Sequence, residues 1–249
     1  MKKQGCFGPT VFLLALFFSP AFAADEQPGG KTQVAPVQKN EKKIVNTSPV
    51  IVDTGASKAQ SEKLYTLFNK SYTKTIAQIQ CLKDLECINS EDDVLKYSIF
   101  NIRLLQKLED IAAKNDLWAM YYRGLIAYER AEDYADRASY VRDRDFIFTA
   151  MVLNRKRNEQ FVEAKKFLTE PAAARIPEAC QYMGNILAKG LGTKVNIDRA
   201  MDFYYCAALE YINADRSLEA RIALKMMTQT GTPTDARTVD VFAKINKNR

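Results

Sequence analysis

Histidine is absent from all 249 residues of the sequence. This side chain is the commonest general base in enzymes and the commonest zinc ligand. Its absence excludes serine–histidine–aspartate triads, HExxH sites and ordinary zinc sites. Carboxylate, lysine and cysteine chemistry remain, but no motif in the chain supports them, so the sequence predicts neither a metal nor a cofactor.

Long apolar runs are also missing. The longest, residues 11–18, is far shorter than the roughly 20 residues that a membrane-spanning helix needs. It follows lysines at positions 2 and 3 and precedes small residues at Ala21 and Ala23, which is the pattern of a cleavable signal peptide. We therefore predict a signal peptide over residues 1–23, cleavage near Ala23/Ala24 and a periplasmic or secreted mature protein. Cys6 lies before the apolar run, which argues against a lipoprotein.

A strong charge imbalance is the third absence. The chain has 36 Lys and Arg against 30 Asp and Glu, a net charge of +6, and loss of the signal peptide leaves +4. Acidic and basic residues also alternate, as in residues 142–145, whereas a phosphate-binding face would cluster positive charge. We expect no nucleic-acid partner.

Four of the five cysteines remain after cleavage: Cys81, Cys87, Cys180 and Cys206. An even number in an oxidising compartment favours disulfides. A helical hairpin that turns near residue 193 would place Cys180 opposite Cys206. Cys81 and Cys87 can pair only if a helix ends between them, because six residues of helix span about 9 Å. The alternative for Cys180 and Cys206 is a pair of buried thiols.

The mature chain begins with a polar, Pro- and Gly-containing stretch, residues 24–59, which we predict to be a disordered linker. From residue 60 to residue 249 the periodicity is helical, and no stretch is typical of a strand. Two apolar stripes, one over residues 64–79 and one over residues 95–111, are predicted to be core. Six further helices are expected between residues 117 and 246.

An internal repeat is clearest over residues 177–211, where small and aromatic residues recur at helix-contact spacing. They are Ala179, Gly184, Gly190, Gly192, Ala200, Phe203, Tyr204, Ala207 and Ala208. The pattern resembles the Sel1-like repeat, a relative of the tetratricopeptide repeat, with Met183 in place of Leu and Arg199 in place of Lys. Residues 119–128 and 164–173 look like the two helices of an earlier repeat. They are separated by an insertion over residues 132–160, and a degenerate third unit follows after residue 218.

The resemblance implies an all-α fold of antiparallel helix pairs stacked as a short right-handed solenoid. It also implies an adaptor or scaffold role with an envelope protein or peptide as partner, possible membership of an envelope or secretion machine, and no catalytic residues. Contacts would come from aromatic and cationic residues on first helices. The candidates are Trp118, Tyr121, Tyr122, Arg123, Tyr128 and Tyr182.

The competing hypothesis is a cell-wall enzyme that cleaves glycan with a single glutamate as general acid. Glu129, Glu178 and Glu210 are available. None stands in a sequence context that predicts a raised pKa, and no lytic-enzyme motif is visible. The sequence therefore favours an adaptor over an enzyme.

Overall fold

The computed structural model describes residues 55–83, 90–142 and 146–247, which lie in the unit Thr47–Arg249. These residues form helices and no strand, so the predicted all-α class is confirmed for them. The predicted signal peptide, Cys87 and residues 24–54 of the predicted linker lie outside the described residues. Residues 55–59 of that linker belong to the first helix.

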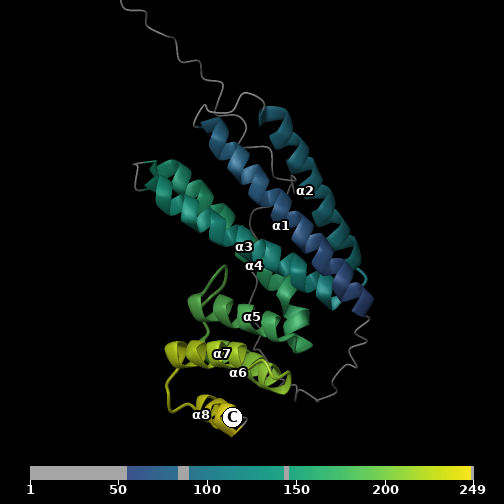
Figure 1. The fold of residues 1–249 in the computed structure, drawn as a ribbon. Coiled ribbons are helices and arrows are strands. Elements are labelled where there is room, and N and C mark those ends of the chain that lie inside the picture. The colour runs from purple at the N-terminus through teal and green to yellow at the C-terminus, as the bar shows by residue number, and fades with distance from the viewer. Residues whose placement is uncertain (1–54, 84–89, 143–145, 248–249) are drawn as a thin grey trace, which may run out of the picture. The chain divides into compact units, whose positions relative to one another are not determined.

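The helices follow one another along the chain with short connections, and each packs on the next (Figure 1). Two further contacts join α1 to α3 and α6 to α8. The helices are α1 (Gly55–Lys83), α2 (Ser90–Ala112), α3 (Leu117–Arg142), α4 (Ile147–Ala173), α5 (Pro177–Lys189), α6 (Ile197–Asn213), α7 (Ser217–Thr230) and α8 (Ala236–Lys247).

Three connections share one backbone geometry. Each contains one non-glycine residue with a positive φ. This residue is Asn115 (62°) between α2 and α3, Arg175 (65°) between α4 and α5, and Asp215 (55°) between α6 and α7. At each turn the amide of that residue donates to the carbonyl three residues earlier. A left-handed residue of this kind ends many helices and satisfies their last carbonyls. The same turn therefore recurs after every second helix from α2 to α7.

The turn from α5 to α6 has local signals at both ends. Pro177 occupies the first turn of α5, where its missing N–H costs nothing. Gly190 caps the helix with φ 66°, and Gly192 follows with φ 60°. The side chain of Asn196 then accepts a hydrogen bond from the amide of Arg199 and begins α6. These four residues explain why α5 begins and ends, and α6 begins, at well-defined positions.

Two glycines allow helices to approach closely. A Cβ at Gly124 would lie 2.7 Å from Cγ of Leu168 on α4, and a Cβ at Gly184 would lie 2.5 Å from Cε1 of Tyr204 on α6. Small residues continue both contacts. Ala164, Ala179, Ala200, Ala207 and Ala208 are fully buried. Phe203 packs against this core from a half-buried position. The α3–α4 and α5–α6 pairs thus use glycine in the same way.

The predicted apolar stripes of α1 and α2 are wrong in part. Leu67 on α1 and Ile99 and Ile102 on α2 are exposed, at 38%, 42% and 48%. The buried face of α2 passes through Asn101, Leu104, Leu108 and Ala112, of which Leu108 belonged to the predicted stripe. α2 has apolar residues on two faces, and periodicity alone could not distinguish the packed face from the other.

Candidate functional site

Five of the six predicted contact residues lie in two groups of touching rings, which together we call the aromatic cluster: Tyr65, Trp118, Tyr121 and Tyr122 form one group, and Tyr128 and Tyr182 form the other. On α3 these residues recur at spacings of three and four, so their side chains share one helix face. Ring centroids are 5.0 Å apart for Tyr121 and Tyr122, and 6.0 Å for Trp118 and Tyr121. Tyr65 of α1 stacks on Tyr122 at 5.1 Å, and Tyr182 of α5 meets Tyr128 edge-on at 4.8 Å.

Carboxylates surround this cluster. The phenol of Tyr65 donates to Oε1 of Glu129 over 2.6 Å. Burial is the main reason why the pKa of Tyr122 and of Tyr182 is raised to about 12, and the nearby charge of Glu178 contributes in the same direction to both. Glu62 acts in the same direction on Tyr122. The aromatic cluster of α1, α3 and α5 therefore has carboxylates beside it, of which Glu178 is paired with Arg216.

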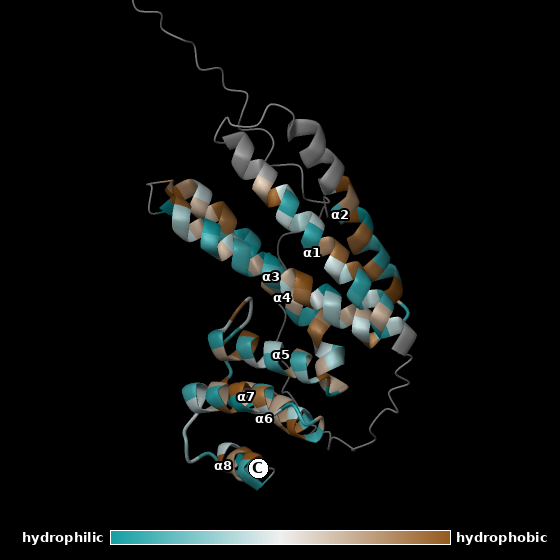
Figure 2. Ribbon diagram, viewed as in Figure 1, coloured by the Kyte–Doolittle hydropathy of each residue, from teal (hydrophilic) through white to brown (hydrophobic). Residues whose placement is uncertain are grey.

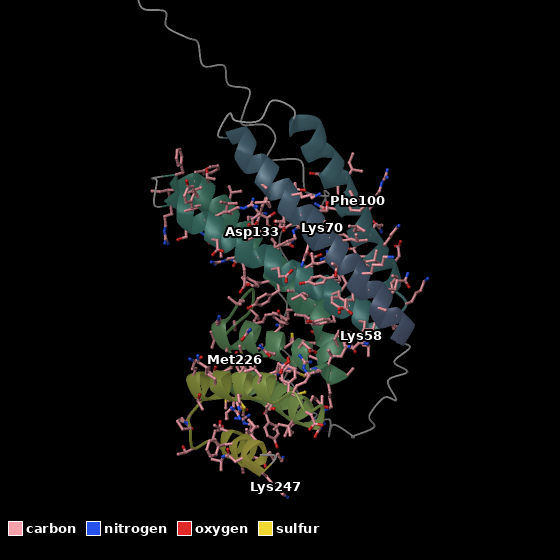
Figure 3. The ribbon with its side chains drawn as sticks, in the orientation of Figure 1. Lys58, Lys70, Phe100, Asp133, Met226 and Lys247 are labelled. Carbon is pink, nitrogen blue, oxygen red and sulfur yellow. The ribbon has the colours of Figure 1, made fainter. Side chains whose placement is uncertain are left out.

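Only part of the aromatic cluster reaches solvent. Tyr121, Tyr122 and Tyr128 are buried, whereas Tyr65, Trp118 and Tyr182 are half-buried and form its accessible edge. The ammonium of Lys58, at the start of α1, already lies 4.1 Å from the centre of the Trp118 ring (Figure 3). A cation over an aromatic face gains about 0.5–1 kcal/mol at an exposed site. The chemistry that suits this edge is that of a lysine or arginine side chain.

Arg123, the sixth predicted contact residue, points away from the aromatic cluster. Its side chain is only 5% exposed and pairs with Glu109 of α2 over 2.9 Å. It also pairs with Glu163 of α4, and the guanidinium lies over the ring of Phe167 at 5.0 Å. Arg123 therefore ties α3 to two neighbouring helices and is not available to a partner.

The three glutamates considered for catalysis all have internal partners. Glu178 pairs with Arg216, and Glu210 pairs with Arg175 over 2.6 Å. Burial raises the pKa of Glu129, against the hydrogen bonds from Tyr65 and Asn69, which lower it. The expectation that none of the three has a raised pKa is thus wrong for Glu129. Tertiary burial between α1 and α3 causes this shift, and no local sequence pattern encodes it.

Cys180 and Cys206 face one another across α5 and α6, with their sulfurs 2.6 Å apart. Both are free in the structure, so the predicted disulfide is not formed there. The hydrogen bond between them lowers the pKa of Cys206, and the same bond together with burial raises the pKa of Cys180. Arg175 also favours the thiolate of Cys206. Two cysteine sulfurs at this distance can be joined in a disulfide once an oxidant is present.

A second surface was missed by the sequence analysis, which treated residues 132–160 as an insertion. The far end of the α3–α4 pair exposes large apolar side chains, and Figure 2 shows hydrophobic segments there. They are Phe146 (60%), Ile147 (65%), Phe148 (78%), Met151 (63%) and Val152 (39%). The signal was the apolar run of residues 146–153, because two paired helices cannot bury every side of it. A shallow hollow of about 680 Å³ follows along α4, lined by Met151, Asn154, Arg155, Asn158, Glu159 and Val162.

The described residues contain neither a metal-binding group nor a membrane-spanning helix. No group of cysteine and carboxylate side chains in them is arranged to bind a metal ion. None of the described helices combines the length and the apolar character that a membrane crossing requires.

Comparison of the chain with protein-family models, curated proteins and solved structures finds no match.

Proposed function

We propose that the protein is an exported adaptor or scaffold that binds a basic segment of an envelope protein or peptide at the aromatic cluster. The signal peptide predicted over residues 1–23 supports export to the periplasm or beyond. The all-helical architecture, in which each helix packs on the next, is typical of proteins that present an extended surface. An accessory place in an envelope or secretion machine is a special case of this proposal.

The Sel1-like solenoid remains part of the proposal, and two features of the backbone support it. The left-handed turns at Asn115, Arg175 and Asp215 recur at every junction between successive helix pairs from α2 to α7. Gly124 and Gly184 make equivalent close contacts in successive pairs. A repeated unit should repeat its turns and its tight contacts, as these do.

The observation that carries the binding proposal is the part of the accessible edge formed by Trp118 and Tyr182. Both rings are half-buried, and the carboxylates of Glu129, Glu132 and Glu178 add negative charge near Tyr182. Lys58 over Trp118 shows the kind of contact that the surface forms with a cation. Aromatic faces with flanking carboxylates favour a partner rich in lysine or arginine.

The experiment is site-specific photocrosslinking in cells that export the protein. A photoreactive residue at position 118 or 182 should capture one defined envelope protein, and Tyr122→Ala should reduce the yield at both positions. The matched control is the same photoreactive residue at Phe242, which is 59% exposed on α8. Equal capture at Phe242, or no reproducible product at positions 118 and 182, would refute the proposal.

The raised pKa of Glu129 favours one second candidate, a glycan-cleaving enzyme with a single glutamate as general acid. Its test is product release from purified peptidoglycan. Release that is lost in Glu129→Gln and kept in Glu178→Gln would support the enzyme. The Glu129 carboxylate accepts hydrogen bonds from Tyr65 and Asn69 that hold α1 on α3, and it does not line the hollow of α4, so we favour the adaptor.

A further inference from the structure

One face of α4 is exposed over five turns and has the spacing of a coiled-coil seam. Six residues at alternating intervals of four and three form it: Phe148, Val152, Arg155, Glu159, Val162 and Lys166, all exposed. This is the a/d spacing of a heptad. The buried residues of α4, among them Ala150, Ala164 and Leu168, lie on the opposite side of the helix. We call the six exposed residues the α4 seam.

The α4 seam is self-complementary when it is read in the reverse direction. Arg155 and Glu159 lie at equal distances on either side of residue 157, and so do Val152 and Val162, and Phe148 and Lys166. In an antiparallel coiled coil an a residue of one helix meets a d residue of the other. A two-fold axis at residue 157 would therefore place each member of these three pairs opposite its counterpart in a second copy.

Each layer of that arrangement pairs residues of complementary chemistry. The central layers contain Arg155, whose side chain is 84% exposed, and Glu159, which is 56% exposed. These residues already pair within one helix over 3.1 Å, and a second copy would convert two such pairs into a network of four alternating charges. Val152 would bury against Val162 in the next layers. Phe148, 78% exposed, would receive the ammonium of Lys166 at each end.

We infer that the α4 seam binds a second copy of this chain, in an antiparallel homodimer centred on residue 157. The charge complementarity of the α4 seam with itself carries the inference, because an unrelated partner would not require matched residues about one point. The contact length from Phe148 to Lys166 is about 27 Å of helix. One helix pair of this length is smaller than a standard interface, so we expect a dissociation constant on the order of micromolar. The inference is independent of the aromatic cluster.

Sedimentation velocity of the mature full chain over a range of concentrations tests the dimer. Wild type should dimerise reversibly. Arg155→Glu alone and Glu159→Arg alone should each weaken the homodimer at least tenfold, because like charges then face each other in both central layers. An equimolar mixture of the two variants should form a heterodimer, and the double variant Arg155→Glu/Glu159→Arg should recover the wild-type affinity. Helical circular dichroism of each variant confirms that it is folded.

Three outcomes would overturn the inference. The first is a wild-type protein that stays monomeric up to about hundredfold the expected dissociation constant. The second is a dimer that is indifferent to both charge reversals. The third is a protein that stays monomeric and binds a different envelope protein, or vesicles of anionic phospholipid, in a way that Arg155→Glu abolishes. That result would assign the α4 seam to that partner. Loss of photocrosslinks at Trp118 and Tyr182 bears only on the adaptor proposal.

Discussion

The α5–α6 hairpin and the far end of the α3–α4 pair are built from the same kinds of contact and differ in length. α5 and α6 have 13 and 17 residues, and Gly190 and Gly192 turn the chain as soon as their contact ends. α3 and α4 have 26 and 27 residues and continue well past the Gly124–Leu168 contact. The added turns of α4 have α3 on one side and solvent on the other. Extra helix length in this fold therefore creates exposed surface more than it creates core.

Gly184→Val should produce the largest change in the comparison. The new Cβ would lie within about 3 Å of the Tyr204 ring, which is rigid and buried, so α5 and α6 must separate. Overpacking of this kind costs about 1–3 kcal/mol, and the β-branched residue gives little propensity in return. Urea denaturation measures the loss. The control is Thr149→Val at the exposed end of α4, where we expect a change below about 0.5 kcal/mol. Equal losses of unfolding free energy at Gly184 and Thr149 would contradict the difference between the packed α5–α6 contact and the exposed end of α4.

Oxidation of Cys180 and Cys206 should change stability by a similar amount, and only in the α5–α6 hairpin. Closing the 26-residue separation between them would stabilise the fold by about 3 kcal/mol in the chain-entropy account. We expect exported protein to unfold at lower urea concentration when reductant is added, and Cys206→Ala to remove that dependence.

Intact mass without reductant provides the direct check. A disulfide removes two hydrogen atoms, and the second predicted bridge, Cys81–Cys87, would remove two more. Cys206→Ala separates the two bridges, because it leaves the second one intact. Four free thiols in protein taken from the periplasm would refute both.

Alkaline pH should weaken the junction of α1, α3 and α5. Burial raises the pKa of Tyr122 and Tyr182 from 10.0 to about 12. Below pH about 10 both phenols are neutral in the folded and unfolded chains, so their contribution is fully present. Between pH about 10 and about 12 the unfolded chain loses these protons first, and stability falls.

Urea midpoints measured across pH 9 to about 12, together with tyrosinate absorbance, test this expectation. The double variant Tyr122→Phe/Tyr182→Phe should lose less stability over the same range, because its rings cannot ionise. The other buried tyrosines, such as Tyr121, also contribute to the alkaline fall, so the fall in the double variant is smaller than in wild type and is not abolished. A double variant with the same alkaline fall as wild type would show that other groups cause it.

Features that depend on residues close together in the sequence were predicted, and features that depend on distant helices were not. Pro177, Gly190 and Asn196 act within one or two turns, so the ends of α5 and the start of α6 have local causes. The facing of Cys180 and Cys206 followed from hairpin geometry and one turn position. By contrast, the raised pKa of Glu129 and the internal partners of Arg123 depend on α1, α2 and α4, which are distant in sequence.

The exposed end of α4 was missed for a different reason. An apolar run such as residues 146–153 is normally interpreted as core, and only the number of neighbouring helices decides whether it is covered. The same ambiguity explains why Ile99 and Ile102 were wrongly predicted to be core. α2 has two apolar faces, and only one of them packs on α1 and α3. Periodicity identifies a face that can pack, and the rest of the fold selects the face that does.

The smallest expected effect on folding is at Phe148, and it separates the two regions most sharply. The side chain is 78% exposed, so Phe148→Ser removes almost no buried surface and should change the free energy of unfolding by less than about 0.5 kcal/mol. The same substitution removes an outer layer of the α4 seam and should weaken self-association several-fold, as seen by sedimentation at fixed concentration. Phe161→Ser, on the buried side of the same helix, should do the reverse and cost about 3 kcal/mol of stability. If Phe148→Ser destabilises the monomer as much as Phe161→Ser does, then the end of α4 is core and the distinction between the two regions fails.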